Sequence, residues 1–354
     1  MVLLLSVLLS GCSASAMRTS SWAGLSADAE TAYLANGSLV YAIDAKNGSQ
    51  LWQYPADGAD NKEAYFATPV LTPDGQLLIA SAGSNHSLTS LDPTNGAANW
   101  TFADAESAWI GAPTVVNETI YAPNSDGNLY AFNLSGNPLW KTLIGDGLWA
   151  QPVSDGEMLY ITSLDHNVYA FEPDTKEIAW SVGVTGAIPG GAAFDENGAL
   201  YVGSFGSNVV RIDINSQSLG WDSEIDGWVW DTPALDGEML YLGDLQGNFH
   251  AFNTSDGSEI FAPVKLNAPI TGTPLVLDDF IVVGTEGVDE NESGKAYAID
   301  REGGIVWQQS ILGKLYTAPV ASGDLILFAP MEADAALVAL DHDGRQVWQF
   351  IPEK

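Results

Sequence analysis

A short motif that ends in an aromatic residue occurs eight times along the chain, and this repeat constrains the fold more than any other feature. Its first copy, LVYAIDAKNGSQLW, covers residues 39–52, and the similar NLYAFNLSGNPLW covers residues 128–140. The closing aromatics follow one another at intervals of 40 to 48 residues: Trp52, Trp100, Trp140, Trp180, Trp221, Phe261, Trp307 and Trp348. A regular period of this length predicts a repeat architecture, in which each unit buries its apolar surface against the next.

Each repeat predicts four β-strands. It starts with a short apolar segment that often contains proline, such as ATPVL (67–71), and continues with a second apolar run, such as TIYAP (119–123). The motif itself supplies the two arms of a hairpin, with turn pairs such as Asn47-Gly48 between them. Because four-stranded units of about 40 residues are typical of propeller blades, residues 22–354 are predicted to form an all-β, eight-bladed β-propeller of four-stranded antiparallel blades.

The closing aromatics are expected to be structural docking residues. Each lies on the predicted outermost strand, where a large ring can pack against the neighbouring blade and bury apolar area. The segment SWAGLSAD (21–28) supplies a first strand for the first blade. The ring therefore closes either between two complete blades or through a strand exchanged across the seam, and the residues alone leave both alternatives open.

Charge excludes one class of partner. Twelve Lys and Arg residues stand against 45 Asp and Glu residues, which gives a net charge of −33 at pH 7. Such a protein repels phosphate backbones. No nucleic-acid partner is expected, and the acidic surface favours a soluble monomer.

Residues 1–12, MVLLLSVLLSGC, form an apolar run that ends at the only cysteine, Cys12. The run is too short to span a bilayer but suits a secretory signal, and LSGC resembles the bacterial lipobox, in which the cysteine receives a lipid. This resemblance implies export and a lipid anchor on Cys12, at the periplasmic face of an outer membrane or the outer face of a single membrane. Residues 13–21 are then a flexible tether. A buried structural cysteine is the alternative, and because no Lys or Arg precedes the run, a start upstream of Met1 stays open.

The repeat also resembles the tryptophan-docking repeat of the PQQ-like propellers, over residues 22–354. Two branches of that family matter. One contains dehydrogenases that hold pyrroloquinoline quinone and Ca²⁺ on the propeller axis. The other contains non-catalytic lipoproteins of the outer-membrane barrel assembly machinery, which dock partner proteins. The present chain is most similar to the second branch, which implies a non-enzymatic, protein-binding scaffold with another envelope protein as its partner.

The residues give the enzymatic branch little support. Most alcohol-oxidising members carry an adjacent cysteine pair, whereas this chain has one cysteine. The acidic stretches 57–63 and 289–293 lack the ordered ligand pattern of a calcium loop, and the four histidines fall in different repeats. No catalytic residue, metal ligand or cofactor is therefore assigned. A propeller that binds a quinone or another small molecule, as a dehydrogenase or a sensor, remains the alternative.

One face of the disk is predicted to bind the partner. The links between blades share a face with the loops between second and third strands, and segments 53–66 and 285–297 are longer there than their counterparts. Extra loop length on one face often marks the working face. The predicted partner-binding residues are Tyr65, Phe66, Glu106, Trp109, Trp149, Arg211, Trp228, Trp230, Asp231 and Tyr316. Two alternatives stay open: the aromatic rings plug the channel, and Arg211, which replaces a small residue of the other repeats, makes a local ion pair.

Overall fold

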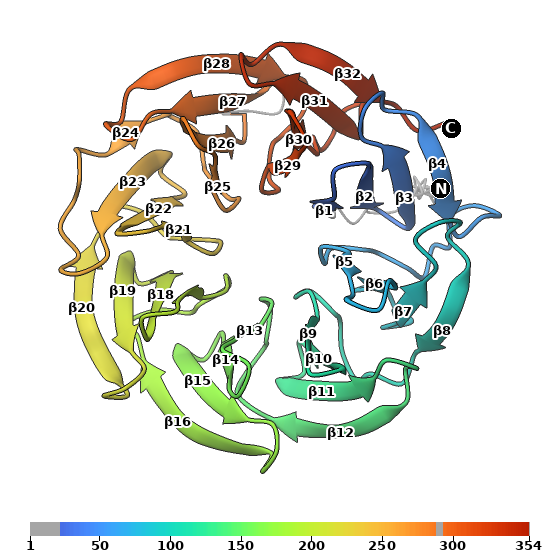
Figure 1. Ribbon diagram of the computed structural model, residues 1–354, viewed down its shortest axis with the longest axis horizontal. Coiled ribbons are helices and arrows are strands. Elements are labelled where there is room, and N and C mark those ends of the chain that lie inside the picture. Colours follow the sequence, from blue (N-terminus) through green and yellow to red (C-terminus); the bar gives the residue numbers. More distant parts are fainter. Residues whose placement is uncertain (1–21, 288–292, 354) are drawn as a thin grey trace, which may run out of the picture.

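The computed structural model describes residues 22–287 and 293–353, which form a closed ring of eight sheets (Figure 1). Every sheet has four antiparallel strands that follow one another in the sequence. The first strand of each sheet lies nearest the ring axis, and the fourth lies at the rim (Figure 1). The predicted eight-bladed β-propeller is thereby confirmed. The predicted signal peptide with Cys12 and the predicted tether lie outside the described residues.

The two inner strands of each blade lead from the axis outward. The first strands have two to four residues each: β1 (Gly24–Ala27), β5 (Val70–Leu71), β9 (Thr114–Val116), β13 (Val153–Ser154), β17 (Ala193–Asp195), β21 (Ala234–Asp236), β25 (Leu275–Val276) and β29 (Val320–Ser322). The second strands are β2 (Thr31–Asn36), β6 (Leu77–Ala80), β10 (Thr119–Pro123), β14 (Leu159–Thr162), β18 (Ala199–Ser204), β22 (Met239–Gly243), β26 (Ile281–Thr285) and β30 (Leu325–Phe328).

The two outer strands of each blade carry the repeated motif. The third strands are β3 (Leu39–Asp44), β7 (Leu88–Leu91), β11 (Asn128–Asn133), β15 (Asn167–Glu172), β19 (Asn208–Asp213), β23 (Asn248–Asn253), β27 (Gly294–Ile299) and β31 (Leu337–Asp341). The fourth strands are β4 (Gln50–Tyr54), β8 (Ala98–Phe102), β12 (Pro138–Leu143), β16 (Glu177–Gly183), β20 (Ser218–Glu224), β24 (Val264–Lys265), β28 (Ile305–Ile311) and β32 (Gln346–Phe350).

The apolar core is divided among the blade interfaces. The second and third strands are buried on both faces, because a neighbouring blade covers each side of the sheet, and the four central residues of β3 are buried without alternation. Buried apolar residues gather in eight clusters, each of which joins two adjacent blades. In one of them Leu34 and Ile43 of the first blade pack with Leu337 of the last. Docking of blade on blade therefore supplies the buried apolar surface.

The closing aromatics form a rim ring, by which we mean the eight docking residues from Trp52 to Trp348. Five of their indole Nε1 groups donate a hydrogen bond to a backbone carbonyl of the next blade: Trp52 to Pro93 (2.8 Å), Trp100 to Leu134 (3.1 Å), Trp221 to Thr254 (2.9 Å), Trp307 to His342 (2.8 Å) and Trp348 to Ala45 (3.0 Å). Six of the rings lie over a turn glycine of that blade: Gly48, Gly96, Gly136, Gly257, Gly303 and Gly344. A Cβ at Gly136 would lie 2.2 Å from the ring of Trp100, so only glycine leaves room.

Blades four to six depart from this pattern. The turns that follow Trp140 and Trp180 carry Lys176 and Gln217 in the glycine position, with φ of 61° and 54°, and among the described residues these two indoles make no hydrogen bond. Phe261 precedes a fourth strand, β24, that is reduced to two residues. Pro263 stands directly before that strand, and a proline has no N–H to donate to a strand ladder. The expectation that every closing aromatic lies within an outermost strand is therefore wrong for Phe261.

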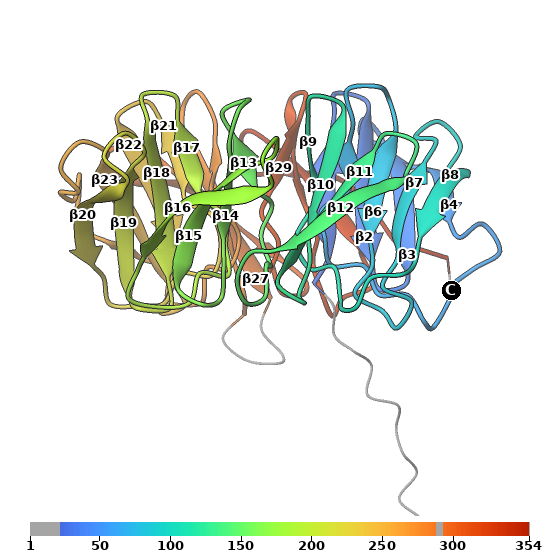
Figure 2. The same ribbon diagram turned by 90° about the horizontal axis from the view of Figure 1, so that it is seen from below.

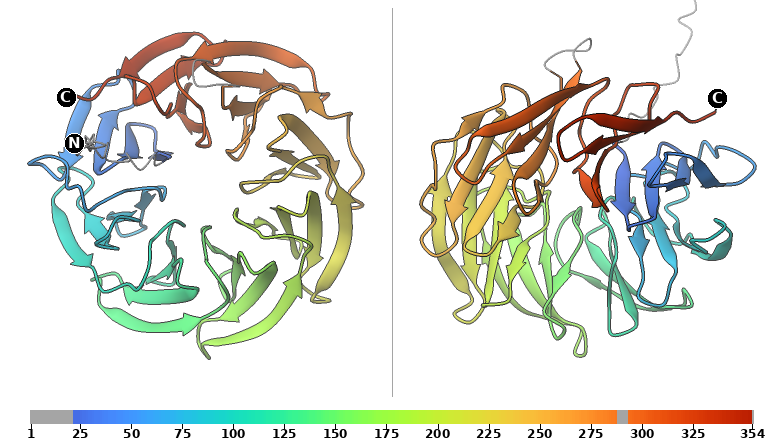
Figure 3. Two further views of the ribbon diagram at one scale, coloured as in Figure 1. Left: turned by 180° about the vertical axis from the view of Figure 1, so that it is seen from behind. Right: turned by 45° about the horizontal axis from the view of Figure 1, so that its top comes forward.

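The ring closes between two complete blades, because each sheet takes its four strands from one continuous stretch of sequence. The first blade (β1–β4) and the last (β29–β32) lie side by side (Figures 1 and 3). Across the seam Trp348 donates to the carbonyl of Ala45, and the hydroxyl of Ser322 donates to the carbonyl of Asp28. The seam therefore uses side chains and no exchanged strand.

The disk has two different faces (Figure 2). One, the link face, carries the links between blades, such as 55–69, and the loops between second and third strands, such as 205–207. The other, the turn face, carries the hairpin turns between first and second strands and between third and fourth strands. Within the described residues, no helix is long and apolar enough to cross a membrane.

Candidate binding site at the axial mouth

Each link between blades places one side chain in the core and the next one at the axis. In the fifth link, Val229 is buried beside Gly203 of β18, whereas Trp230 faces the axial cavity. The sixth and seventh links repeat this pattern with buried Ile270 and Leu315. The axis-facing residues of all eight blades form a mouth ring: Trp22, Phe66, Ile110, Trp149, Pro189, Trp230, Thr271 and Tyr316. Five of the eight are aromatic, so the mouth of the channel is largely walled by rings.

Four of these rings contact one another across the axis. The ring of Trp22 is stacked on that of Tyr316, with centroids 5.4 Å apart, and meets the edge of Phe66 at 4.6 Å. It also approaches Trp230 at 6.2 Å, and Trp230 approaches Tyr316 at 5.7 Å. Since these residues come from the first, second, sixth and eighth blades, Trp22 bridges the mouth. The aromatic contacts thus partly close the channel.

A cavity of about 280 Å³ lies among the mouth ring and the residues that follow it. Asp231 supplies its one ionisable carboxylate: Oδ1 accepts a hydrogen bond from the backbone N–H of Thr232 (2.7 Å), and Oδ2 accepts one from the N–H of Thr273 (3.1 Å). Burial raises the pKa of this carboxyl, although the two hydrogen bonds oppose the shift. The site is therefore apolar, aromatic and acidic.

An exposed tryptophan and a half-buried phenylalanine adjoin the mouth on the link face. Trp228 has 54% of its surface exposed and stacks on Phe205, with ring centroids 5.3 Å apart. Phe205 in turn lies 5.6 Å from Trp230, which joins the pair to the mouth ring. Exposed rings next to a partly filled cavity form the kind of surface in which interface hot spots occur.

Two predicted face residues are buried instead. Tyr65 is 1% exposed and packs with Trp52, and Trp109 is fully buried and donates from Nε1 to the carbonyl of His86 (2.7 Å). The reason is the alternation within the links, since both residues stand one place before a mouth-ring residue and therefore point into a blade interface. The expectation that they bind a partner is corrected to a role in the core.

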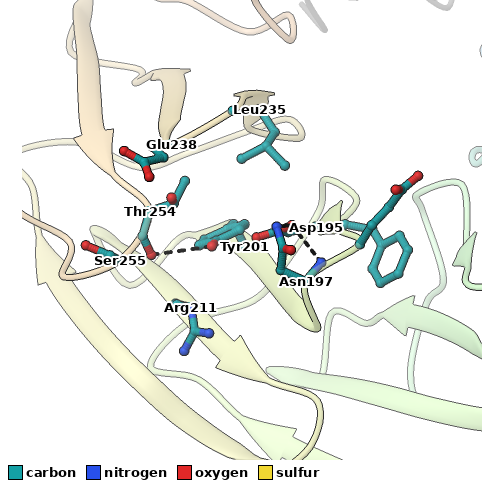
Figure 4. A pocket seen from close by; sticks show the side chains of 11 residues that line it. Asp195, Asn197, Tyr201, Arg211, Leu235, Glu238, Thr254 and Ser255 are labelled. Atoms are coloured by element: carbon teal, nitrogen blue, oxygen red, sulfur yellow. Dashed lines mark hydrogen bonds between the residues drawn. The ribbon is translucent and has the colours of Figure 1, made fainter.

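Two other predicted residues lie away from the mouth. Glu106 pairs with Lys141, a surface contact between a link and β12. Arg211 lies in a pocket of about 590 Å³ between the fifth and sixth blades, among turn-face residues such as Asn197 and Glu238 (Figure 4). Its guanidinium is 3.4 Å from the carboxylate of Asp213, so the open alternative of a local ion pair describes it, and Arg211 is not part of the link face.

The axial cavity brings together five of the predicted partner-binding residues: Phe66, Trp149, Trp230, Asp231 and Tyr316. A sixth, Trp228, lies beside the cavity. Sequence reasoning missed Trp22 and Phe205. Trp22 precedes the first strand of its blade as Phe66 and Trp149 precede theirs, so aligning the eight segments that lead into the first strands would have found it. Phe205 lies in a loop between second and third strands, where the repeat gives no comparable signal.

The axial cavity does not fit the cofactor of the enzymatic branch. Pyrroloquinoline quinone carries several carboxylate groups, but no lysine or arginine stands among the described residues that line the cavity, and Asp231 would repel the cofactor. Within the described residues, no group of three His, Cys, Asp or Glu side chains is placed to hold a metal ion.

Comparison with known proteins adds a second line of observation. A family profile described as outer membrane protein assembly factor BamB matches residues 12–147, 164–272 and 263–353. Two curated proteins of that name are each 24% identical to this chain. The match to the one from Moranella endobia (strain PCIT) covers 78% of this chain and 72% of that protein, and the match to the one from Shewanella oneidensis covers 84% and 79%.

Solved structures agree on the fold. The crystal structure of BamB from Moraxella catarrhalis superposes with a TM-score of 0.72 at 19% identity, over 92% of this chain and 96% of that one. The computationally designed protein Ika8 gives a TM-score of 0.73 at 14% identity, over 94% and 98%. At such identities the likeness concerns architecture alone.

Proposed function

Because the chain belongs to the family of the outer membrane protein assembly factor BamB, we propose that it is a lipid-anchored, extracytoplasmic scaffold that binds another envelope protein during outer-membrane protein assembly. The protein acts as a monomer and catalyses no reaction. The proposal commits to one surface, the link face around the axial mouth, and to one kind of partner, a component of the barrel-assembly process.

The observation that carries the proposal is the position of one exposed ring, that of Trp228, on the link face. This ring stacks on the half-buried Phe205, which in turn approaches Trp230 of the mouth ring. Large aromatic side chains beside a desolvated cavity supply most of the binding energy in many interfaces. Acidic groups around them favour a partner with basic or amide-rich segments.

The anchor supports the same orientation. Trp22 lies in the mouth ring and follows Cys12 by ten residues. An extended chain of that length reaches at most about 35 Å, so a lipid on Cys12 would hold the link face near the membrane. A partner embedded in or attached to that membrane would then meet the aromatic surface directly.

Site-specific crosslinking tests the surface. A photoreactive phenylalanine analogue in place of Trp228 should crosslink to a barrel-assembly component in the envelope of the source organism. The matched control places the analogue at Leu219, an apolar residue of β20 that is 44% exposed and lies at the rim. Equal crosslinking at the two positions, or capture of no assembly component at position 228, would contradict the proposed surface.

The double variant Trp149→Ala/Trp230→Ala gives an independent measure of the same surface. It removes two mouth-ring side chains without touching the rim ring, and recovery of the assembly component in a pull-down should fall several-fold. A separate variant, Cys12→Ala, should move the protein from the membrane fraction to the soluble fraction. Membrane retention of that variant would refute the lipid anchor while leaving the binding surface untouched.

A further inference from the structure

One ionisable residue interrupts a ring of small neutral ones. The position after the mouth ring is occupied, blade by blade, by Ala23, Ala67, Gly111, Ala150, Gly190, Asp231, Gly272 and Thr317. Asp231 is thus the only member that brings a charge to the axial cavity. Placing a carboxylate where water is scarce costs free energy. A residue that weakens the fold in this way points to a use outside folding.

Blade docking does not require that charge. Other blades make their contacts at the same depth with neutral groups: the hydroxyl of Thr162 donates to the carbonyl of Gly190 at 2.7 Å, and that of Thr271 to the carbonyl of Tyr316 at 2.9 Å. The hydrogen bond from the N–H of Thr273 to Asp231 joins two blades in a similar manner. Of the two hydrogen bonds to Asp231, only this one joins the blades, and a neutral oxygen could accept it, so blade docking does not by itself require a negative charge.

The carboxylate has no positive partner. Among the described residues no lysine, arginine or histidine forms an ion pair with Asp231, and none lines the cavity. Burial raises the pKa of the Tyr316 phenol, and the negative charges of Glu286 and Asp231 raise it further. Burial raises the pKa of Glu286 as well, although the positive charge of Lys314 opposes that shift. Asp231 therefore brings to the cavity a negative charge that no cationic side chain among its described lining residues balances.

The walls of the cavity complement a cation. Trp22, Trp230 and Tyr316 lie within contact distance of one another around the axis. An aromatic face attracts a cation placed over it, and the attraction grows as the surroundings lose water. A volume of about 280 Å³ holds one group of side-chain size, since pockets for drug-sized ligands begin at roughly 300 Å³.

We propose that the axial cavity binds one organic cation, a guanidinium or alkylammonium group, held by Asp231 against the rings of Trp22, Trp230 and Tyr316. A basic side chain of the envelope partner and a free small cation offer the same chemistry to this site. Only the first of these two sources of the cation depends on the proposed function. The two sources are separated by the experiment below.

Calorimetric titration of the whole protein with butylguanidinium tests the site, with butylurea as the neutral ligand of nearly the same shape. Butylguanidinium should bind at least tenfold more tightly and should change the tryptophan fluorescence, because three of the cavity-lining residues are tryptophans. This comparison needs no variant and so does not depend on folding of an altered chain. Equal affinities, or no binding of butylguanidinium at millimolar concentration, would overturn the proposal.

Three variants locate the site. Asp231→Asn should weaken butylguanidinium binding at least tenfold, and Trp230→Leu should weaken it about threefold to tenfold, as expected for the loss of one ring. Asp146→Asn removes the same charge from an exposed position of the link face outside the cavity, and it should leave the affinity unchanged. If Asp146→Asn lowers the affinity for butylguanidinium as much as Asp231→Asn does, the effect comes from net charge alone. That result would overturn the assignment of the cation site to Asp231.

Crosslinking from position 228 identifies the source. If Asp231→Asn lowers the yield of the crosslinked assembly component, the partner supplies the cation; an unchanged yield, with butylguanidinium binding lost, assigns the site to a free small cation. The two proposals can also fail separately. Butylguanidinium binding without any crosslinked partner would support the cation site and contradict the proposed scaffold function. A crosslinked partner without butylguanidinium binding would support the scaffold function and contradict the cation site.

Discussion

The rim and the mouth of this propeller both carry a ring of aromatic residues, but the two rings differ in how faithfully they repeat. At the rim all eight positions are aromatic, and most indoles donate to the next blade over a glycine turn. At the mouth, Ile110, Pro189 and Thr271 replace aromatics, and a carboxylate interrupts the neighbouring positions. Every blade needs a docking contact, so the rim residues repeat in every blade. A single ligand at the axis does not require the same residue from each blade, so the mouth residues need not repeat. Departure from the repeat therefore separates the residues of the proposed binding site from those that dock the blades.

The largest expected effect tests this separation directly. Trp348→Ala should lower the free energy of unfolding by about 3 to 5 kcal/mol, because it removes a buried ring and the hydrogen bond to Ala45 at the seam. Trp228→Ala removes an equal side chain from the mouth side and should change stability by less than about 0.5 kcal/mol. Urea titration followed by circular dichroism measures both. Similar losses in the two variants would break the distinction between the rings.

The glycine under a rim tryptophan is the next test. Gly136→Ala should cost about 2 to 3 kcal/mol, because a Cβ there meets the ring of Trp100 and φ is +75°. Gly75→Ala is the matched control, since it has a φ of +83° and open space around it, so it should cost about 1 kcal/mol. The difference between the two unfolding energies isolates the contact with the ring, and an equal cost would show that the contact contributes nothing.

Two carboxylates of the sixth blade sharpen the comparison through pH. Although burial opposes it, hydrogen bonds from His250 and Asn248 hold the pKa of Asp244 below its ordinary value, whereas burial raises that of Asp231. Asp244 therefore stabilises the fold above the unfolded pKa of about 3.9, and this contribution disappears as the pH falls through the folded pKa. Asp231 does the opposite: the folded state loses stability as the pH rises through its raised pKa.

Substitution of each carboxylate by Asn tests these opposite effects of pH on the free energy of unfolding. At pH 7, Asp244→Asn should lose about 1 to 3 kcal/mol, since it breaks a buried hydrogen-bonded charge. The loss should shrink at pH 3. Asp231→Asn should lose less stability than Asp244→Asn at pH 7, because removal of the buried charge offsets the loss of one backbone N–H acceptor, and it should flatten the dependence of stability on pH. A loss of stability in Asp231→Asn at pH 7 that matches the loss in Asp244→Asn would mean that the mouth carboxylate is structural.

The smallest effect concerns an exception at the rim. Lys176 occupies the turn position where most blades have glycine, with a φ of 61° that favours glycine. Lys176→Gly should therefore stabilise the protein by a few tenths of a kcal/mol, a gain limited by the added freedom of the unfolded chain. Thermal unfolding would register an increase of about one degree. A decrease would indicate that the lysine side chain contributes to docking of Trp140.

Much of the architecture could be predicted because the repeat reports each blade separately. Eight closing aromatics fixed the number of blades, and the links predicted Phe66, Trp149, Trp230 and Tyr316 for the mouth. Adjacent aromatics set the limit. Tyr65 and Phe66 are neighbours in the sequence. The alternation of buried and axis-facing side chains places Tyr65 in the core and Phe66 at the axis. Its phase is visible only in coordinates or in an alignment of the eight segments that lead into the first strands.

Arg211 shows a second limit of the sequence. It stands in the third strand where the other repeats have a small residue, but the pattern contains no information about which face its long side chain reaches. Gly220 on the adjacent strand leaves space for the guanidinium, and the side chain lies in the turn-face pocket (Figure 4). A repeat thus shows which residue is unusual. The direction of that residue's side chain depends on which neighbouring residue is small enough to leave space for it, here Gly220.

The seam without an exchanged strand has a consequence for how such a disk can change. Each blade is a self-contained stretch of about 40 residues, so duplication or deletion of one stretch leaves no orphan strand behind. The seven links are equivalent places at which to open the polypeptide once the two ends at the seam are joined, and a circularly permuted gene would encode the same set of sheets. New termini could then be placed on the link face without disturbing any strand pairing.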